Sequence, residues 1–256
     1  MLYSTALTAQ NQALEEYKSG ISERLQNLAA RISGAARAAG RSADEVRLLA
    51  VSKTWPAEAV RSAAAAGQQA FGENYVQEGV AKVEALAGLG LEWHFIGPLQ
   101  SNKTRLVANH FAWVHSIDRL RIAQRLSEQR DVHLPPLQVC LQVNVSGEDS
   151  KSGVAPDELP ALALAVAALP RMRLRGLMAI PEPTSDTALQ RRRFAQLRQL
   201  RDALAAQGLV LDTLSMGMSD DLEAAIAEGS TMVRVGTAIF GARTYPAQGT
   251  AGPAAS

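Results

Sequence analysis

The run Leu48-Leu49-Ala50-Val51-Ser52-Lys53 is an apolar, strand-like segment that ends in a single cation. It belongs to the first of eight short apolar segments, and a helical pattern separates each segment from the next. The predicted strands cover residues 47–51, 70–71, 93–96, 113–116, 137–145, 174–180, 213–216 and 232–235. Strict alternation of strands and helices indicates parallel strands. Eight of them in a chain of 256 residues favour an α/β fold that closes into a (β/α)8 barrel.

An additional helix is predicted before the first strand, over residues 10–39, and Gly40 ends it. The connecting helices are predicted at residues 57–66, 76–87, 101–109, 119–129, 156–168, 187–206 and 222–227. An open doubly wound sheet is the alternative, but the Gly-x-Gly-x-x-Gly pattern of dinucleotide folds does not follow the first strand. We therefore expect a single TIM-type barrel domain at residues 10–245, with an N-terminal extension at 1–9 and a flexible tail at 246–256.

The composition is ordinary for a globular protein, with 47% hydrophobic and 20% charged residues. Lysine and arginine together exceed aspartate and glutamate by one, so the charge indicates neither a nucleic-acid partner nor a membrane partner. No apolar run approaches the roughly 20 residues that cross a bilayer, and the N-terminus lacks a secretory pattern. We expect a cytoplasmic protein, and a monomer, because a closed barrel without a companion domain has no evident need for a partner.

Cysteine and histidine usage does not indicate a metal site. Cys140 is the only cysteine, and its strand-like surroundings favour a small buried hydrophobe over a reactive thiol. The four histidines show no spacing of metal-ligand type; they are His94, His110, His115 and His133. We interpret His94 as a core or rim histidine and predict no metal.

Lys53 lies at the C-terminal end of the first strand, where a barrel of this kind carries its chemistry. Burial disfavours the charged ammonium and lowers the pKa of a lysine, which frees the amine as a nucleophile for Schiff-base chemistry. The alternative is a structural lysine whose amine extends from the strand end into solvent. Position alone leaves both interpretations open.

The loops after the seventh and eighth strands resemble a phosphate site, which barrels commonly build there. Ser219 is predicted as the N-cap of the next helix, where its hydroxyl and backbone N–H groups would face an anion. Gly236 allows close approach of the backbone, and Thr237 adds a hydroxyl donor. The alternative for Ser219 is an ordinary helix cap without a ligand.

Arg234 lies inside the apolar eighth strand, where an arginine needs an acceptor. One possible partner is a carboxylate on another strand. The other is a heteroaromatic ring nitrogen, which would stay unprotonated because arginine can only donate a hydrogen bond. An unprotonated pyridine nitrogen is a weak electron sink.

Six segments of the chain, in order, resemble one family. They are residues 49–54 (LAVSKT), 71–78 (FGENYVQE), 93–103 (WHFIGPLQSNK), 174–180 (LRGLMAI), 214–221 (LSMGMSDD) and 233–241 (VRVGTAIFG). The chain is similar over most of its length to the YggS/PROSC family of pyridoxal 5′-phosphate homeostasis proteins. These are single-domain relatives of the N-terminal barrel of bacterial alanine racemase.

The resemblance implies a fold-type III barrel that binds pyridoxal 5′-phosphate (PLP) as a Schiff base on the motif lysine. It further implies that the motif arginine faces the pyridine nitrogen, that the motif asparagine lines the cofactor, and that serine, glycine and threonine residues contact the phosphate. The corresponding residues are Lys53, Arg234, Asn74, Ser215, Ser219, Gly236 and Thr237.

Three classes of function compete. The first is a carrier that binds and buffers PLP, supports its intracellular homeostasis and passes it to apo PLP-dependent enzymes. The second is a PLP-dependent enzyme with low racemase- or decarboxylase-type activity, and the third is a cofactor-free aldolase. Racemisation needs an acid/base group on each face of the substrate, and Tyr75 is the only conspicuous candidate besides Lys53. We therefore expect a carrier without efficient catalysis.

Overall fold

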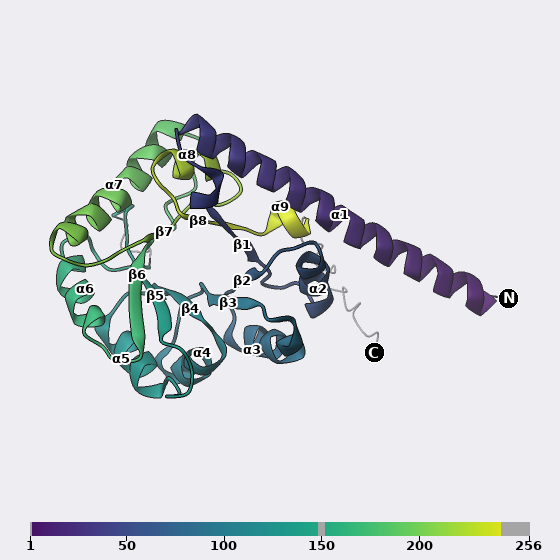
Figure 1. Ribbon diagram of the computed structural model, residues 1–256, viewed down its shortest axis with the longest axis horizontal. Coiled ribbons are helices and arrows are strands. Elements are labelled where there is room, and N and C mark those ends of the chain that lie inside the picture. The colour runs from purple at the N-terminus through teal and green to yellow at the C-terminus, as the bar shows by residue number, and fades with distance from the viewer. Residues whose placement is uncertain (1, 148–151, 242–256) are drawn as a thin grey trace, which may run out of the picture.

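The eight predicted strands form a closed parallel barrel in sequence order (Figure 1). The computed structural model describes residues 2–147 and 152–241. The strands are β1 (Arg47–Val51), β2 (Ala70–Glu73), β3 (Glu92–Phe95), β4 (Trp113–Ile117), β5 (Leu137–Gln142), β6 (Met172–Met178), β7 (Thr213–Ser215) and β8 (Met232–Val235). Pairing of β1 with β8 closes the barrel, from Arg47 opposite Met232 to Ala50 opposite Val235. The predicted fold class is thus confirmed.

Helices surround the strands (Figure 1). They are α1 (Leu2–Ala38), α2 (Ala57–Ala65), α3 (Val76–Ala85), α4 (Thr104–His110), α5 (Leu120–Gln129), α6 (Leu159–Ala167), α7 (Thr187–Ala206), α8 (Leu222–Ala227) and α9 (Thr237–Phe240), with 3-10 turns η1 (Ala43–Glu45), η2 (Ala87–Leu89) and η3 (Ser101–Lys103). The short helix α9 was not predicted. Within the described residues, no helix is both long and apolar enough to cross a bilayer.

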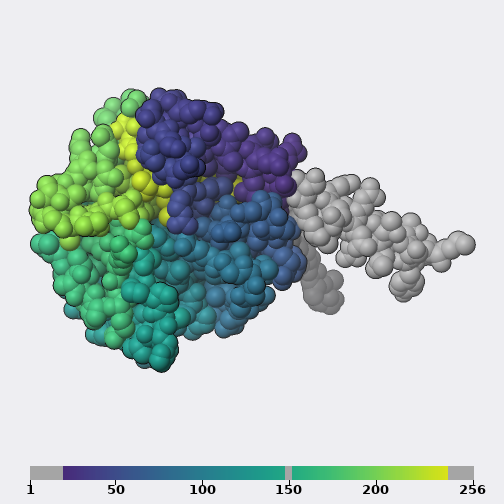
Figure 2. Space-filling model, viewed as in Figure 1, coloured from purple at the N-terminus to yellow at the C-terminus, as the bar shows by residue number. Residues whose placement is uncertain are grey.

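Helix α1 begins at Leu2, so residues 2–9 continue the helix that was predicted to start at residue 10. Five of its residues are buried at spacings of three or four, which is the apolar stripe of a packed helix; they are Ile21, Leu25, Leu28, Ile32 and Ala36. This stripe packs on α2, α8 and α9. Figure 2 shows the purple N-terminal residues beside the yellow C-terminal ones. The predicted tail, residues 246–256, lies outside the described part of the chain.

The strands are buried on both faces, as expected when helices cover a parallel sheet. Cys140 on β5 is fully buried, and burial raises the pKa of its thiol to about 12, so it is the inert hydrophobe that was predicted. At Gly176 on β6, an added Cβ would lie 1.7 Å from the carbonyl oxygen of Thr213. Strands β6 and β7 therefore approach this closely only because residue 176 has no side chain.

Candidate functional site

A cavity of about 570 Å³ lies at the C-terminal ends of the strands. Six of the seven predicted site residues line it: Lys53, Asn74, Ser219, Arg234, Gly236 and Thr237. They come from four separate strand–helix connections, which the parallel barrel gathers at one end. Ser215, the seventh, is fully buried and is not among the residues that line the cavity.

Lys53 is half-buried and sits in a tight turn directly after β1. The turn is closed by a hydrogen bond from Trp55 N–H to the carbonyl oxygen of Ser52 (3.0 Å). Thr54 has a φ of 68°, which is unfavourable for a β-branched residue. Its N–H donates to Glu78 Oε1 (2.5 Å), which holds this conformation. The strained turn fixes the direction in which the Lys53 side chain leaves the strand.

A buried ionic cluster anchors this turn from behind. The Lys82 ammonium donates to the Ser52 carbonyl, to Glu73 Oε1 and to Glu78 Oε1, each at 2.7 Å. Ser52 Oγ also donates to Glu73 Oε1 (2.6 Å). Burial raises the pKa of Glu73, and the positive charge of Lys82 opposes that shift. Our reading of the sequence missed this cluster, although the four-residue spacing of Glu78 and Lys82 on one helix was an available signal.

Arg234 is buried, and its guanidinium is held by backbone and hydroxyl oxygens. Nη1 donates to the Ser215 carbonyl (2.5 Å) and to Ser215 Oγ (2.8 Å), and Nη2 donates to the Ala179 carbonyl (2.9 Å). Within the described residues Arg234 has no ion pair, so the structure does not contain the carboxylate partner considered above. Burial lowers the pKa of Arg234 to about 10, which leaves the group charged at neutral pH. Three of its five N–H groups are used, and two remain for a ligand.

Ser219 is not a helix N-cap, so that prediction was wrong. Helix α8 begins at Leu222, and its N-cap position is Asp221. The Asp221 carboxylate accepts a hydrogen bond from Met218 N–H (2.6 Å), which keeps residues 218–221 in a loop. Ser219 therefore reaches the cavity from that loop.

Several polar groups in the cavity have no protein partner. Asn74 Oδ1 is buried and accepts no hydrogen bond from any described residue. The hydroxyls of Ser219 and Thr237, which also line the cavity, make no hydrogen bond with any described residue. Buried polar atoms normally have partners, so the unpaired Oδ1 of Asn74 indicates a place for a polar ligand.

Arg31 on α1 also lines the cavity, and our sequence analysis missed it. Its guanidinium forms a two-pronged ion pair with Glu223 on α8 (2.5 and 2.7 Å). Arg24, seven residues earlier, donates to the carbonyl of Ile239 on α9 (2.6 Å). A seven-residue spacing places two side chains on the same helix face, and this was the available signal. Helix α1 therefore supports the rim of the cavity.

A chain of buried hydrogen bonds runs from Arg234 through the barrel toward the N-terminal ends of the strands. Ser215 Oγ lies 2.8 Å from His115 Nδ1, and His115 Nε2 lies 2.9 Å from His94 Nδ1. His94 Nε2 lies 2.7 Å from Glu92 Oε1. Burial lowers the pKa of both histidines, so both rings are neutral. His94 is thus the hydrogen-bonded core histidine that was predicted.

The groups at the two ends of this hydrogen-bond chain determine which atom donates in each of its bonds. Arg234 can only donate, and Glu92, whose pKa is lowered to about 2 mainly by the hydrogen bond from His94, can only accept. A neutral imidazole donates from one nitrogen and accepts at the other. His94 and His115 therefore both donate from Nε2, and Ser215 donates to His115 Nδ1 while it accepts from Arg234. The Ser215 hydroxyl is fully engaged inside the barrel.

Comparison with known proteins agrees with this geometry. The family described as "Alanine racemase, N-terminal domain" matches residues 24–244. A pyridoxal phosphate homeostasis protein of Pseudomonas aeruginosa is 67% identical over 229 residues, which cover 90% of this chain and 98% of the relative. The protein of the same name from Escherichia coli K12 is 60% identical over 233 residues, covering 88% and 97%.

A solved structure with PLP bound is also similar. It is PipY of Synechococcus elongatus, which superposes with a TM-score of 0.77 at 40% sequence identity. The match covers 86% of this chain and 100% of PipY.

Proposed function

This chain belongs to the YggS/PROSC family of pyridoxal phosphate homeostasis proteins, and we propose that it carries and buffers PLP on Lys53. The observation that carries the proposal is the convergence, in one cavity, of the strand-end lysine, a buried arginine with two unused N–H groups, and the buried, unpaired Oδ1 of Asn74. When bound, PLP supplies an aldehyde that condenses reversibly with an amine and releases water.

The residues of the cavity fit the parts of this cofactor. Lys53 supplies the amine, and the strained turn holds it in place. Arg234 donates to the pyridine nitrogen, which stays unprotonated because a guanidinium can only donate a hydrogen bond. Ser219 and Thr237 donate to the phosphate, and Gly236 admits it close to the backbone. Asn74 lines the cofactor, as the resemblance implies.

Ser215 has a different role from the one that the resemblance implies. Its hydroxyl accepts from Arg234 and donates to His115, so it positions the arginine instead of contacting the phosphate. The Ser215 hydroxyl and the backbone carbonyls of Ser215 and Ala179 therefore hold Arg234 in a fixed position facing the ring nitrogen.

A carrier is favoured over an enzyme of the racemase or decarboxylase type. Among the described residues that line the cavity, Lys53 is the only amine and Asp220 the only carboxylate. Tyr75 is 56% exposed and does not line the cavity, so it offers no acid on the second face of a substrate. An unprotonated ring nitrogen also weakens carbanion stabilisation. An enzyme of low activity remains the second candidate.

The test is reduction of the PLP-loaded protein with borohydride, followed by mass mapping of the labelled peptide. The wild type should carry one pyridoxyl group on Lys53, and Lys53→Ala should carry none while its circular dichroism stays unchanged. Lys103→Ala, which alters another strand-end lysine, is the matched control and should label fully. Labelling of Lys53→Ala to the wild-type level would contradict the proposal.

Carrier and enzyme are then separated by two assays on the loaded protein. A carrier should restore activity to an apo PLP-dependent enzyme and should show no turnover of amino acids. Turnover that disappears in Lys53→Ala would establish the enzyme instead. The expected monomeric state is tested by light scattering on the same sample.

A further inference from the structure

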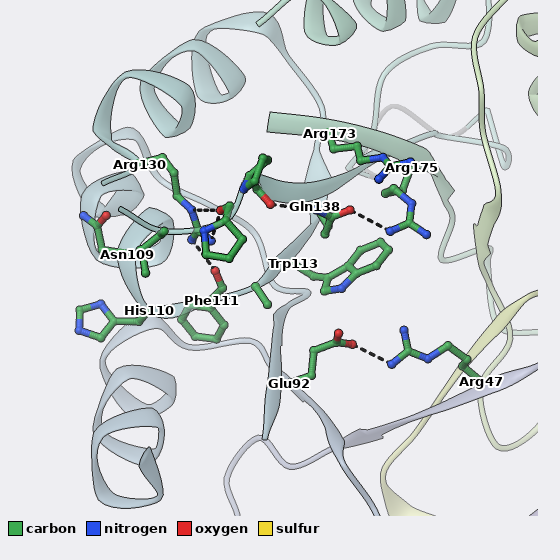
Figure 3. A pocket seen from close by; sticks show the side chains of 14 residues that line it. Arg47, Glu92, Asn109, His110, Phe111, Trp113, Arg130, Gln138, Arg173 and Arg175 are labelled. Carbon is green, nitrogen blue, oxygen red and sulfur yellow. Dashed lines mark hydrogen bonds and ion pairs between the residues drawn. The ribbon is translucent and has the colours of Figure 1, made fainter. Parts of the chain in front are cut away.

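A second cavity, of about 540 Å³, lies at the opposite end of the barrel (Figure 3). Arg47 is the first residue of β1 and Trp113 the first of β4, while Gln138 and Arg173 are the second residues of β5 and β6. These are the N-terminal ends of parallel strands. The cavity therefore faces away from Lys53, and no residue of the Lys53 cavity lines it.

This N-terminal cavity is strongly basic, with four arginines against one glutamate among its described lining residues. One of the four, Arg130, is structural. Its guanidinium donates to the carbonyl oxygens of Ala108, Phe111 and Pro135, which ties helix ends together. The other three arginines project from β1 and β6.

These three arginines are arranged on one side of the cavity (Figure 3). Arg173 and Arg175 are two residues apart on β6, so their side chains share a face of the strand. Arg47 pairs with Glu92 (2.8 Å), and Arg175 pairs with Asp212 (2.6 Å). Arg173 is exposed and, within the described chain, makes no hydrogen bond or ion pair. Its charge is available to an anion.

The Arg175 guanidinium is already oriented. Its Cζ atom lies 5.0 Å from the centre of the Trp113 ring, and Nη1 donates to Gln138 Oε1 (2.8 Å). A guanidinium held over an aromatic ring loses little side-chain entropy when it binds a ligand. Glu92 and Asp212 offset two of the three arginine charges, since Glu92 pairs with Arg47 and Asp212 with Arg175, which leaves the charge of Arg173 in excess.

The side of the cavity opposite these three arginines mixes apolar and polar groups. Phe111 lies there with Asn109, His110 and Arg130 (Figure 3), and the apolar residues Leu134, Pro135 and Pro136 also line the cavity. We propose that this cavity is a binding site for a phosphate monoester with a small apolar body. The unpaired guanidinium of Arg173, together with the remaining N–H groups of Arg47 and Arg175, matches a phosphate group, and the volume is in the range of small-molecule sites. The described residues that line the cavity include no lysine, so the proposed ligand would not be held there as a Schiff base.

The test is a titration of the full-length protein with phenyl phosphate, observed through the indole N–H resonance of Trp113. Trp113→Phe assigns that resonance among the three tryptophans. We expect a saturable shift with a dissociation constant on the order of 1 mM or below. Inorganic phosphate should bind more weakly, because it lacks the apolar body. Because the signal comes from Trp113, phosphate that binds near Thr237 does not interfere.

Variants identify the side chains that hold the phosphate. Arg173→Gln should weaken binding about tenfold, as expected for one charge-assisted hydrogen bond. It breaks no contact within the described chain, so it should fold normally. Arg47→Gln combined with Arg173→Gln should abolish the shift. Arg192→Gln on α7, which alters an arginine that is 66% exposed, is the control and should bind like the wild type.

Three outcomes would overturn the proposal. They are the lack of a saturable shift in the wild type, undiminished binding in the double variant, and an equal loss in Arg192→Gln. Equal affinity for inorganic and phenyl phosphate would show that the apolar side chains lining the cavity do not hold the apolar body of the ligand.

Discussion

The two ends of this barrel hold cavities of similar size that differ in how their polar groups are partnered. At the C-terminal end, the buried Oδ1 of Asn74 accepts no hydrogen bond from any described residue, and a buried Lys82–Glu73 pair supports the turn that carries Lys53. At the N-terminal end, most arginines are already paired, and the pairs are partly exposed. An unpaired buried acceptor thus distinguishes the Lys53 end of the barrel, whereas an excess of arginines distinguishes the other end.

The largest expected effect concerns the buried pair. Lys82→Met would leave the Glu73 carboxylate buried without its cation, and we expect the free energy of unfolding to fall by about 3–5 kcal/mol. Arg47→Met at the other end removes a half-exposed pair and should cost less than about 1 kcal/mol. Urea denaturation of both variants measures the difference.

The double variant Lys82→Met/Glu73→Leu is the control, because replacing both members of a buried pair with apolar residues is often close to neutral. It should recover most of the loss. If Lys82→Met proved no more destabilising than Arg47→Met, the contrast between the two ends would be lost.

The next effect concerns the hydrogen-bond chain that joins the two ends. Ser215→Ala removes an acceptor of Arg234 and the donor to His115, so we expect a loss of about 1–3 kcal/mol in the free energy of unfolding. Ser116→Ala is a matched control, because Ser116 Oγ is buried without a partner among the described residues. Its removal should be neutral or stabilising. Thermal and urea denaturation measure both variants, and equal losses in the free energy of unfolding would count against the hydrogen-bond chain.

A smaller effect should appear in the pH dependence of stability. The folded pKa of Glu92 is about 2, below the unfolded value of about 4.3. Its contribution is therefore fully present above about pH 4.3 and is lost as the pH falls toward 2. Burial raises the pKa of Glu73, so its contribution has the opposite sign, and stability falls as the pH rises above about 4.3.

Unfolding free energies of the wild type, Glu92→Gln and Glu73→Gln across this acid range measure the two contributions. The difference between wild type and Glu92→Gln should shrink on acidification, and the difference for Glu73→Gln should change in the opposite direction. A pH-independent difference for Glu92→Gln would show that its carboxylate is not specially stabilised.

The smallest stability effect is expected at the cavity rim. Arg31→Ala breaks an exposed ion pair with Glu223 and should change the free energy of unfolding by about 1 kcal/mol or less. Because Arg31 lines the Lys53 cavity, PLP should nevertheless dissociate faster, which absorbance during dialysis would record. Arg37→Ala on the same helix is the control, and equal rates for both variants would remove Arg31 from the rim.

Much of the architecture was predictable from the sequence, because each strand is a short apolar run between helical segments. The same alternation predicted that the strand ends meet at one end of the barrel, where six of the predicted site residues line one cavity. The inward position of Ser215 was not predictable. It depends on how β7 is rotated within the closed barrel, which the apolar pattern of a strand buried on both faces does not encode.

Contacts between distant segments were also beyond the sequence. His94 and His115 meet because β3 and β4 are neighbours with a particular register, His94 lying opposite Trp113. Helix α8 begins at Leu222 as predicted, but Asp221 and not Ser219 occupies its N-cap position, because the Asp221 side chain accepts a hydrogen bond from the backbone N–H of Met218 in its own loop. Arg31 reaches the cavity only through the packing of α1 on the closed barrel.

The one-way chain from Arg234 to Glu92 has a consequence for the barrel as a whole. If His94 took up a proton, both of its nitrogens would become donors, and His115 would have to move its own proton from Nε2 to Nδ1. Ser215 would then accept from both neighbours, and its hydroxyl proton would lose its acceptor. A change in the protonation state of His94 would thus reach Ser215 and Arg234 as a change of the His115 tautomer, without displacement of any backbone atom.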